Sequence, residues 1–573
     1  MGELVGLGTR GEQVGLRWAA IVTMSVLLVV TSVSTGEAKG RDPGKIDPAL
    51  LALATANPTR DFAVIVRAAL TKTKGDHAAK RAKAAIDRAK GKFGHSLSIA
   101  GGASATLNGA AVLALTKDKD VGFVSQDHVL TAKFDPAQGA GTLTTPGLVG
   151  IGVPDAWTQY GAIGRGIGVA VIDSGIAPSL DLAGRIVASV DFTTGAPGEP
   201  LVAPADPGGH GTHVAGLIAG DGTASAGAYT GLAPGANLVD VRVIGAGGAT
   251  TVSTLLRGMQ WVLANKATYN IRVANMSLGA AATLSYRNDP LATAAEVLTF
   301  AGIAVVVSAG NSGPGETTVT TPGYDPFVIT VGALDDNGTP ALDDDSLASW
   351  SSRGPTALDG IAKPDLVAPG RKMVSLRSPG STLDQMYPDR QVAGTDLLAP
   401  AYFRMSGTSM AAPVVAGTIA LMLERNPSLR PAQLKHRLMG TATPLAFGSP
   451  NTIGNGLLNV SAAVGSADSA SFVPTNPVSD GFATEMYALL VGQAIAWRDP
   501  SYNGGVDSNG VLWSDITWDT IAWNEITWEN LSWNAFNWAG ITWEEVTWEE
   551  ITWETTSQNV NILGGARGWV LVN

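Results

Sequence analysis

Four side chains of this 573-residue chain could together carry out acyl transfer: a carboxylate, an imidazole, a hydroxyl and an amide. Asp173 ends an apolar run, His210 lies between glycines before a second run, and Ser409 stands in a Gly-Thr-Ser sequence before a third. Asn311 follows Gly310 after a further apolar run. In such chemistry a serine is the nucleophile, a histidine takes its proton, an aspartate orients the histidine, and an amide donates to the developing oxyanion.

Each of these residues also has an ordinary structural interpretation. An aspartate after a buried strand and a serine at a helix start are commonly capping residues, and asparagine is routine in glycine-rich turns. His210 and His213 are three residues apart, so a zinc pair is an alternative, although no H-E-x-x-H pattern or cysteine accompanies them. The four candidates occur together in the order Asp, His, Ser, which is one of the orders known in serine hydrolases. Their combination favours nucleophilic catalysis.

The composition removes other classes of function. The chain has no cysteine, which excludes disulfides, thiolate metal sites and a cysteine nucleophile. Its formal net charge is −11, and residues 501–573 alone carry 10 Asp+Glu against 1 Lys+Arg. Because nucleic-acid binding requires a basic surface, we expect no nucleic-acid partner.

Residues 1–38 have the features of a signal peptide. Arg10 and Arg17 precede an apolar run over residues 18–30, which is followed by small residues. This run is shorter than the about 20 residues that a membrane-spanning helix needs. We therefore expect export and removal of the segment, and a secreted mature chain. An uncleaved membrane anchor is the alternative, because acidic residues dilute the positive charge before the run.

Two further ranges, 39–140 and 141–465, show different patterns of expected secondary structure. The first has the pattern of a small α+β module with a basic helix, followed by a Gly/Thr/Pro-rich linker at 136–147. In the second, nearly continuous apolar strands alternate with helices, which predicts a doubly wound parallel sheet with helices on both faces. Expected segments of the first range are 62–66, 76–92, 110–115, 121–124 and 129–132. Expected strands of the second are 168–172, 238–243, 273–276, 303–307 and 327–331, and expected helices are 211–219, 252–264, 291–300 and 410–424.

Several motifs make residues 148–465 resemble the subtilisin-like serine proteases, the subtilase family. The motifs that match are V-I-D-S-G-I at 171–176, H-G-T-H-V-A-G at 210–216, G-T-S-M-A-A-P at 407–413, A-G-N at 309–311, N-M-S-L-G at 275–279, S-S-R-G-P at 351–355 and K-P-D-L-V-A-P-G at 363–370. The resemblance implies a secreted serine endopeptidase acting on polypeptides, with Asp173, His210 and Ser409 as the triad and Asn311 in the oxyanion hole. A catalytically silent binding or cell-envelope protein with this scaffold is the alternative, although all four positions hold competent residues.

The resemblance also implies how a substrate binds. Peptides pair in the family as an added strand, which here would involve Ser277, Leu278 and Gly279 and the stretch after Val243. Gly310 is a further candidate binding residue. Because Gly279 and Gly310 are small, we expect an open first pocket that accepts large apolar or aromatic side chains.

Further implications of the resemblance concern regulation and metals. Residues 39–140 match, by size and pattern, the inhibitory propeptide that subtilases carry as a folding aid and then remove; a permanent accessory domain is the alternative. No cofactor is required for the chemistry, and structural calcium is implied by the family alone. Individual metal ligands stay unassigned. The loop carboxylates that could ligate calcium, or simply be solvated, are Asp206, Asp221, Asp343, Asp344 and Asp345.

The C-terminus consists of an expected linker, 466–512, and a Trp-rich tail, 513–573. Nine tryptophans recur every five residues from Trp513 to Trp553. An aliphatic or aromatic residue stands three places after each of the first eight. Residues five apart do not fall on one side of a helix or on one face of a strand. The coils of a repetitive β-structure could place the indole rings on one side. The tail is therefore either an attachment surface for a cell envelope or polysaccharide, giving cell-surface association, or a soluble spacer.

Overall fold

The computed structural model describes residues 43–69, 78–132, 146–194, 200–395, 400–474, 476, 478–479, 562–565 and 568–571. The expected signal peptide, the tryptophan repeat and the linker up to residue 145 lie outside these ranges. The sequence predicted a linker up to residue 147, but its last two residues, Pro146 and Gly147, are helical and begin α5 (Pro146–Gly150). Within the described ranges, no helix combines the length and the apolar character that a membrane crossing requires.

Residues 43–126 form an α+β module around a four-stranded antiparallel sheet with the order β2-β3-β1-β4. The basic helix predicted over 76–92 is α3, whose Ala82, Ala85 and Ile86 recur at helical spacing and are buried against the sheet. Strands β2 and β3 were not predicted, because glycine and polar residues interrupt their apolar pattern. The elements are η1 (Pro43–Lys45), α2 (Pro48–Ala56), β1 (Asp61–Ala68), α3 (Ala78–Arg88), β2 (Lys92–Leu97), η2 (Ser98–Ala100), β3 (Gly102–Asn108), α4 (Gly109–Leu115) and β4 (Val121–Gln126).

The predicted parallel sheet is confirmed and has eight strands in the order β14-β13-β12-β10-β6-β8-β7, with β15 beside β13. All of its pairs are parallel except the short β13–β14 pair. Residues of the central strands are buried on both faces, which explains their nearly continuous apolar runs. The strands are β6 (Gly168–Asp173), β7 (Ile186–Asp191), β8 (Asn237–Arg242), β10 (Ile271–Met276), β12 (Ala304–Ser308), β13 (Ile329–Asp335), β14 (Ser346–Leu347) and β15 (Leu366–Pro369).

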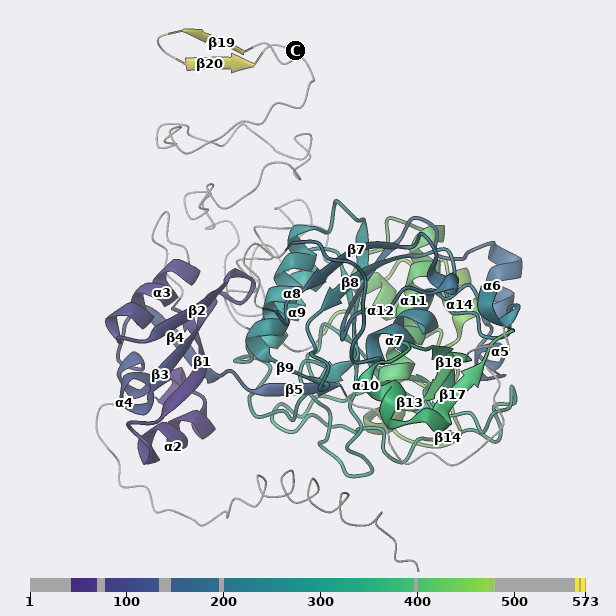
Figure 1. Ribbon diagram of the computed structural model, residues 1–573, viewed down its shortest axis with the longest axis horizontal. Coiled ribbons are helices and arrows are strands. Elements are labelled where there is room, and N and C mark those ends of the chain that lie inside the picture. The colour runs from purple at the N-terminus through teal and green to yellow at the C-terminus, as the bar shows by residue number, and fades with distance from the viewer. Residues whose placement is uncertain are drawn as a thin grey trace, which may run out of the picture. The chain divides into compact units, whose positions relative to one another are not determined.

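Helices cover both faces of this sheet, as predicted. Helix α7 (His210–Ala219) lies beside α11 (Thr408–Arg425), and α8 (Val252–Ala264) lies beside α9 (Pro290–Phe300) (Figure 1). Apolar residues of the first pair join one core cluster, and those of the second pair join the other. Helix α11 is buried from Thr408 to Leu423, so it runs through the interior and carries no polar face.

Most of the remaining elements are short; four of them lie in connections between strands of the parallel sheet, and the others precede β6 or follow β15. They are β5 (Val129–Ala132), α6 (Val153–Tyr160), η3 (Leu180–Leu182), η4 (Thr223–Ser225), β9 (Ala249–Thr251), β11 (Leu278–Gly279), β16 (Met373–Leu376), α10 (Thr382–Met386), η5 (Pro388–Arg390), β17 (Gln391–Ala393), β18 (Pro400–Met405), α12 (Pro431–Gly440), α13 (Pro450–Ile453), α14 (Val460–Gly465), β19 (Ile562–Gly565) and β20 (Gly568–Leu571).

Packing against the sheet domain continues beyond residue 465. The backbone N–H of Phe472 donates to the carbonyl of Ala432 at 2.9 Å. Ser479 is buried, and its backbone N–H and hydroxyl donate to the carboxylate of Glu296 in α9 at 2.9 and 2.8 Å. The chain up to Ser479 therefore contributes to the sheet domain.

Candidate active site

Asp173 and His210 form a buried hydrogen-bonded pair at the carboxyl edge of the sheet. Asp173 is the last residue of β6 and His210 the first of α7. His210 Nδ1 lies 2.8 Å from Asp173 Oδ1 and 3.0 Å from Oδ2. Since an ionised carboxylate can only accept, Nδ1 carries the proton and Nε2 is left with its lone pair. Nε2 is buried and has no hydrogen-bond partner within the described part of the chain.

Electrostatics at His210 favour the imidazolium. Burial is the largest single influence and disfavours the charged ring, but the negative charge and hydrogen bond of Asp173, with a further contribution from Asp206, outweigh it. The pKa of His210 is therefore raised above its ordinary value. A ring that gains affinity for a proton in this way is suited to take one from a neighbouring hydroxyl.

A buried aspartate that sequence reasoning did not place in the site holds α7 in position. Asp206 Oδ1 accepts from the backbone of Gly209 at 2.7 Å and from the Ser174 hydroxyl at 2.8 Å, and Oδ2 accepts from the Thr212 backbone at 2.8 Å. These bonds satisfy N–H groups that the first turn of a helix leaves without partners. Asp206 lies four residues before His210 but outside the H-G-T-H-V-A-G motif, so no motif assigned it this role.

The other histidine of the motif does not form a zinc pair. His213 is fully buried, and its Nε2 lies 3.1 Å from the carbonyl of Met373 and 3.0 Å from that of Phe403, so it acts as a donor. Burial and the neighbouring His210 lower the pKa of His213 to about 3. His213 is therefore a neutral core residue that ties α7 to two neighbouring strands.

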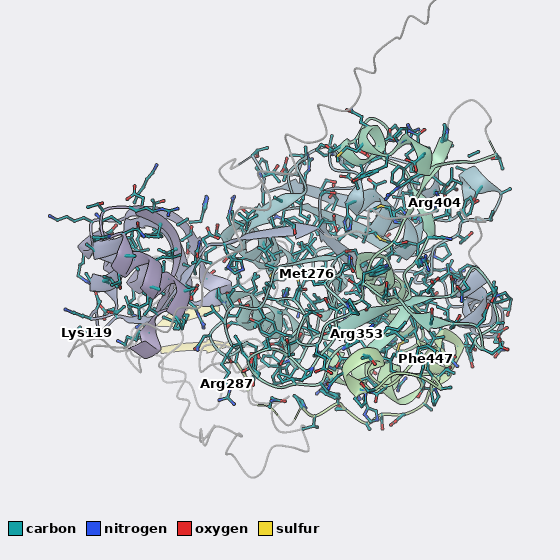
Figure 2. The ribbon with its side chains drawn as sticks, turned by 90° about the horizontal axis from the view of Figure 1, so that it is seen from below. Lys119, Met276, Arg287, Arg353, Arg404 and Phe447 are labelled. Atoms are coloured by element: carbon teal, nitrogen blue, oxygen red, sulfur yellow. The ribbon has the colours of Figure 1, made fainter. Side chains whose placement is uncertain are left out.

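Ser409 lies in the first turn of α11 and contacts the end of β10. Its Oγ donates to the carbonyl of Ser277 at 3.0 Å, and the Ser277 hydroxyl donates back to the carbonyl of Ser409 at 2.9 Å. Ser277 directly follows β10, which pairs with β6 through Asn275 and Val171. The serine is thus tied to the strand adjacent to the one that ends in Asp173. Met276, which ends β10, lies inside the body of the molecule, whereas Arg287 reaches its surface (Figure 2).

Asn311 is oriented by the residue before the serine. Its Oδ1 accepts from the backbone N–H of Thr408 at 2.9 Å and from the Thr408 hydroxyl at 2.8 Å. With the oxygen held in this way, the amide NH₂ group is directed away from Thr408. The backbone N–H of Gly310 donates to the same hydroxyl at 3.1 Å, so Thr408 couples the asparagine turn to the start of α11.

An extended segment of the chain itself pairs with the expected substrate-binding residues. Strand β5 is the central strand of a three-stranded antiparallel sheet, with β11 on one side and β9 on the other. Ala132 is opposite Leu278, and Thr131 is opposite Gly279. Leu130 is fully buried and joins a core cluster of the sheet domain. The backbone at Leu278 and Gly279 therefore accepts an added strand.

The space beside Gly279 and Gly310 is narrower than predicted. A Cβ atom added to Gly279 would lie 2.5 Å from Thr320 Oγ1, and one added to Gly310 would lie 2.7 Å from Thr320 Cγ2. Thr320 is 2% exposed, and its backbone N–H donates to the carbonyl of Ala309 at 3.0 Å. No motif identified this threonine. Its side chain lies next to both glycines of the expected first pocket and takes up space beside them.

The described residues leave the candidate calcium ligands unassigned. They contain no group of three or more His, Asp and Glu side chains that could hold a metal ion. Asp206 is occupied by the helix start of α7. Asp345 is buried, and burial followed by repulsion from neighbouring carboxylates such as Asp336 and Asp344 raises its pKa to about 7. No calcium ligand is assigned among the described residues, and the catalytic steps described below use protein groups alone.

Comparisons with known proteins agree with this geometry. The sequence profile of the Subtilase family matches residues 164–456. Serine protease AprX of Bacillus subtilis (strain 168) is 44% identical over 306 residues, which is 52% of this chain and 65% of that protein. Subtilisin Savinase of Lederbergia lenta is 37% identical over 303 residues, 53% of this chain and 92% of that protein. The crystal structure of fervidolysin from Fervidobacterium pennivorans is similar in fold, with a TM-score of 0.54 and 24% identity over 73% of this chain and 62% of that one.

Proposed function

Because the chain belongs to the subtilase family of serine proteases, we propose that it is a secreted serine endopeptidase, made as a self-processed zymogen, that cleaves peptide bonds with Asp173, His210 and Ser409. The observation that carries the proposal is the buried 2.8 Å hydrogen bond between Asp173 and His210, at the edge of the sheet where α11 begins and Ser409 lies in its first turn. This bond sets the imidazole tautomer that nucleophilic catalysis needs.

The proposed reaction begins with the Ser409 hydroxyl. Its Oγ turns from the carbonyl of Ser277 towards His210 Nε2, gives up its proton there and attacks the peptide carbonyl. Asp173 stabilises the imidazolium that forms. The Asn311 amide and the N-terminal end of α11 stabilise the negative oxygen of the tetrahedral intermediate. His210 then gives the proton to the leaving amine. In the second half of the reaction His210 takes a proton from a water molecule, which attacks the acyl-enzyme, and then returns that proton to Ser409 Oγ as the acid product leaves.

The zymogen part of the proposal rests on β5. As the central strand between β9 and β11, it occupies the backbone positions that a substrate strand would use. An α+β module that ends in such a strand is expected to inhibit the enzyme until it is removed. We assign residues 39–140 to this propeptide, residues 1–38 to the signal peptide, and residues 513–573 to a tail that attaches the enzyme to the cell surface or acts as a spacer.

Covalent labelling tests the catalytic assignment. A serine-directed fluorophosphonate is expected to label the processed protein and to leave Ser409→Ala unlabelled, and peptidase activity should fall by roughly 10⁴–10⁶-fold, the scale known for triad variants of subtilisin itself. Ser406→Ala is the matched control, because Ser406 is buried in the same loop and accepts from the Lys372 backbone at 2.6 Å. Label on Ser409→Ala would refute the assignment, and an unlabelled, inactive wild type would favour a silent binding protein.

A further inference from the structure

Residues 377–391, here called the α10 segment, are bound to the loop that precedes the catalytic histidine. The segment follows β16, contains α10 and η5, and reaches the first residue of β17. It lies between the K-P-D-L-V-A-P-G motif, which ends at Gly370, and the motif of Ser409, and it belongs to neither. The catalytic steps above therefore give it no role, although it contacts residues 206–209, which lead into His210.

The first turn of α10 is bonded to this loop. The backbone N–H of Thr382 donates to the carbonyl of Pro207 at 2.9 Å. The backbone N–H of Leu383 donates to the carbonyl of Gly208 at 3.1 Å. The N–H groups of a first helical turn have no partner within their own helix, so the loop supplies the acceptors that α10 lacks.

Two serines of the α10 segment complete the contact. The Ser378 hydroxyl donates to the carbonyl of Asp206 at 2.7 Å, so three successive carbonyls of the loop accept from this segment. Gly209 has a φ of +98°, and a Cβ atom added to it would overlap Ser381 Oγ. The residue before His210 is thus packed directly against the start of α10.

Asp384 holds the α10 segment together from within. Its carboxylate receives two hydrogen bonds from the Arg377 guanidinium, at 2.5 and 2.8 Å, and one each from the Gly380 N–H and the Gln391 amide, both at 2.8 Å. Asp384 is 6% exposed. Burial alone would raise the pKa of Asp384, but the bonds from Arg377 and Gly380 outweigh it and lower the pKa below its ordinary value. The pair is therefore ionic, and its two-pronged geometry fixes both ends of the segment.

The loop that the α10 segment holds carries groups that set the charge state of His210. The titratable side chains around His210 are Asp173 at the end of β6, Asp206 in the loop and His213 one turn further along α7. The Asp206 carbonyl accepts from the α10 segment, and its carboxylate accepts from N–H groups at the start of α7. A displaced loop would therefore move Asp206 and His210 relative to Asp173.

We propose that the α10 segment is a positioning element for the catalytic histidine and that Asp384 is a positioning residue within it. The proposal rests on the proposed peptidase function. Asp384 fixes the first turn of α10, and this turn fixes the loop before His210. The described partners of Asp384 all belong to the α10 segment, so it acts through the loop and not at the reacting atoms. Proton transfer depends on small changes in such geometry.

Asp384→Asn tests this role, because it removes the negative charge with little change in size. Arg377 then lacks its carboxylate partner, and the loop before His210 is held less tightly. We expect kcat per active site, counted with a fluorophosphonate, to fall about 10-fold or more while KM changes by less than about 2-fold. The acid limb of kcat/KM should move to lower pH, because the raised pKa of His210 requires Asp173 and Asp206 in place.

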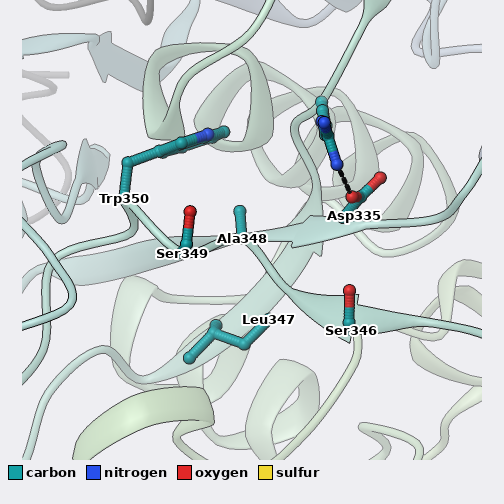
Figure 3. Close-up of a pocket in the computed structure, with 7 residues that line it drawn as sticks. Asp335, Ser346, Leu347, Ala348, Ser349 and Trp350 are labelled. Atoms are coloured by element: carbon teal, nitrogen blue, oxygen red, sulfur yellow. Dashed lines mark hydrogen bonds and ion pairs between the residues drawn. The ribbon is translucent and has the colours of Figure 1, made fainter.

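Asp335→Asn is the matched control. Asp335 is a buried aspartate at the end of β13, and its carboxylate forms an ion pair with Arg371 (Figure 3). Within the described residues, neither member of this pair is hydrogen-bonded to residues 206–209. Loss of this pair should lower the melting temperature but leave kcat and the acid limb unchanged. Ser378→Ala, which removes one hydrogen bond to the loop, should lower kcat by about 3-fold.

Proton NMR of the full chain gives a measurement that does not depend on turnover. The low-field signal of His210 Nδ1–H reports the hydrogen bond to Asp173, and its pH titration reports the His210 pKa. In Asp384→Asn this signal should weaken and titrate at lower pH. Unchanged kcat and titration in Asp384→Asn, or equal changes in Asp335→Asn, would overturn the positioning role. A wild type that hydrolyses no peptide would instead overturn the proposed peptidase function, and the NMR titrations would still decide the positioning role.

Discussion

At the scale of single residues, the chemistry of the site depends on how each side chain is held by its neighbours. Asp173 selects the His210 tautomer, and Thr408 selects the orientation of the Asn311 amide. Both partners are buried, so neither bond competes with bulk water. The proposed site is therefore preorganised, which lowers the cost of reaching the transition state.

The raised pKa of His210 leads to a prediction about pH. The ring must be neutral to act as a base, so activity should be lost as pH falls through the His210 pKa, which lies above its usual value because of Asp173. In Asp173→Asn that contribution is gone, and we expect the acid limb of kcat/KM to move to lower pH while kcat falls by about 10⁴-fold. A pH–rate profile of both proteins tests this. An unshifted acid limb would show that another group controls it.

Thr320 leads to a prediction about side-chain size. Because its methyl and hydroxyl groups lie against Gly279 and Gly310, we expect the enzyme to prefer small residues on the acyl side of the scissile bond. Thr320→Gly should raise kcat/KM for a Phe substrate about 10-fold or more, with little change for an Ala substrate.

Matched variants separate side-chain size from loss of the hydroxyl. Thr320→Val keeps the size of the side chain and should keep the preference, and Thr418→Ala, a buried threonine within α11, should have no effect. Equal behaviour of Thr320→Gly and Thr320→Val towards the Phe substrate would contradict the size argument.

At the scale of elements, β5 connects the α+β module to the sheet domain. It contributes a buried side chain, Leu130, and an exposed one, Thr131, as expected for alternation along a strand. Just before it, the Asp127 carboxylate accepts from the backbone and hydroxyl of Ser253 at the start of α8, at 2.9 and 2.6 Å. The module is thus attached through a strand and through a helix N-terminus, where a carboxylate is stabilising.

A charge placed on β5 tests its role. Leu130→Asp buries an unpaired carboxylate, so the module should dissociate sooner and activity should develop with a lag about 10-fold shorter than in the wild type. Thr131→Asp adds the same charge to the exposed face of the strand and should leave the lag nearly unchanged. The measurement is a time course of peptidase activity from purified zymogen. Equal lags in all three proteins would mean that β5 does not limit activation.

At the scale of the whole molecule, the sheet domain includes described residues beyond position 465, among them Ser479. The buried Glu296 carboxylate accepts both donors of this residue. Burial, and then repulsion from Asp325, raises the pKa of Glu296 well above its ordinary range. Loss of Ser479 would leave this carboxyl group short of partners in the interior, whereas β19 and β20 pair with each other.

Two truncations test this boundary. Deletion of residues 480–573 should leave the melting temperature nearly unchanged. Deletion of residues 466–573 should lower it by several degrees, because leaving Glu296 unsatisfied costs about 2 kcal/mol and each kcal/mol shifts Tm by about 2–4 °C in a domain of this size. Calorimetry of the two truncated proteins and of Ser479→Ala measures the effect. Equal melting temperatures for both truncated proteins would show that residues 466–479 do not stabilise the sheet domain.

Local sequence determined much of this protein. The apolar runs predicted five strands of the parallel sheet and four helices to within a few residues, because burial on both faces demands such runs. The motifs around Asp173, His210, Ser409 and Asn311 indicated the family because their residue types and order are specific.

Only the tertiary structure decided which distant segments meet. The hydrogen bond of Asp206 to Ser174, the position of Thr320 against two glycines, and the pairing of β5 with β9 and β11 all depend on contacts between segments far apart in the chain. Local propensity carries no information about such pairing, since register and proximity arise when the whole sheet closes its core.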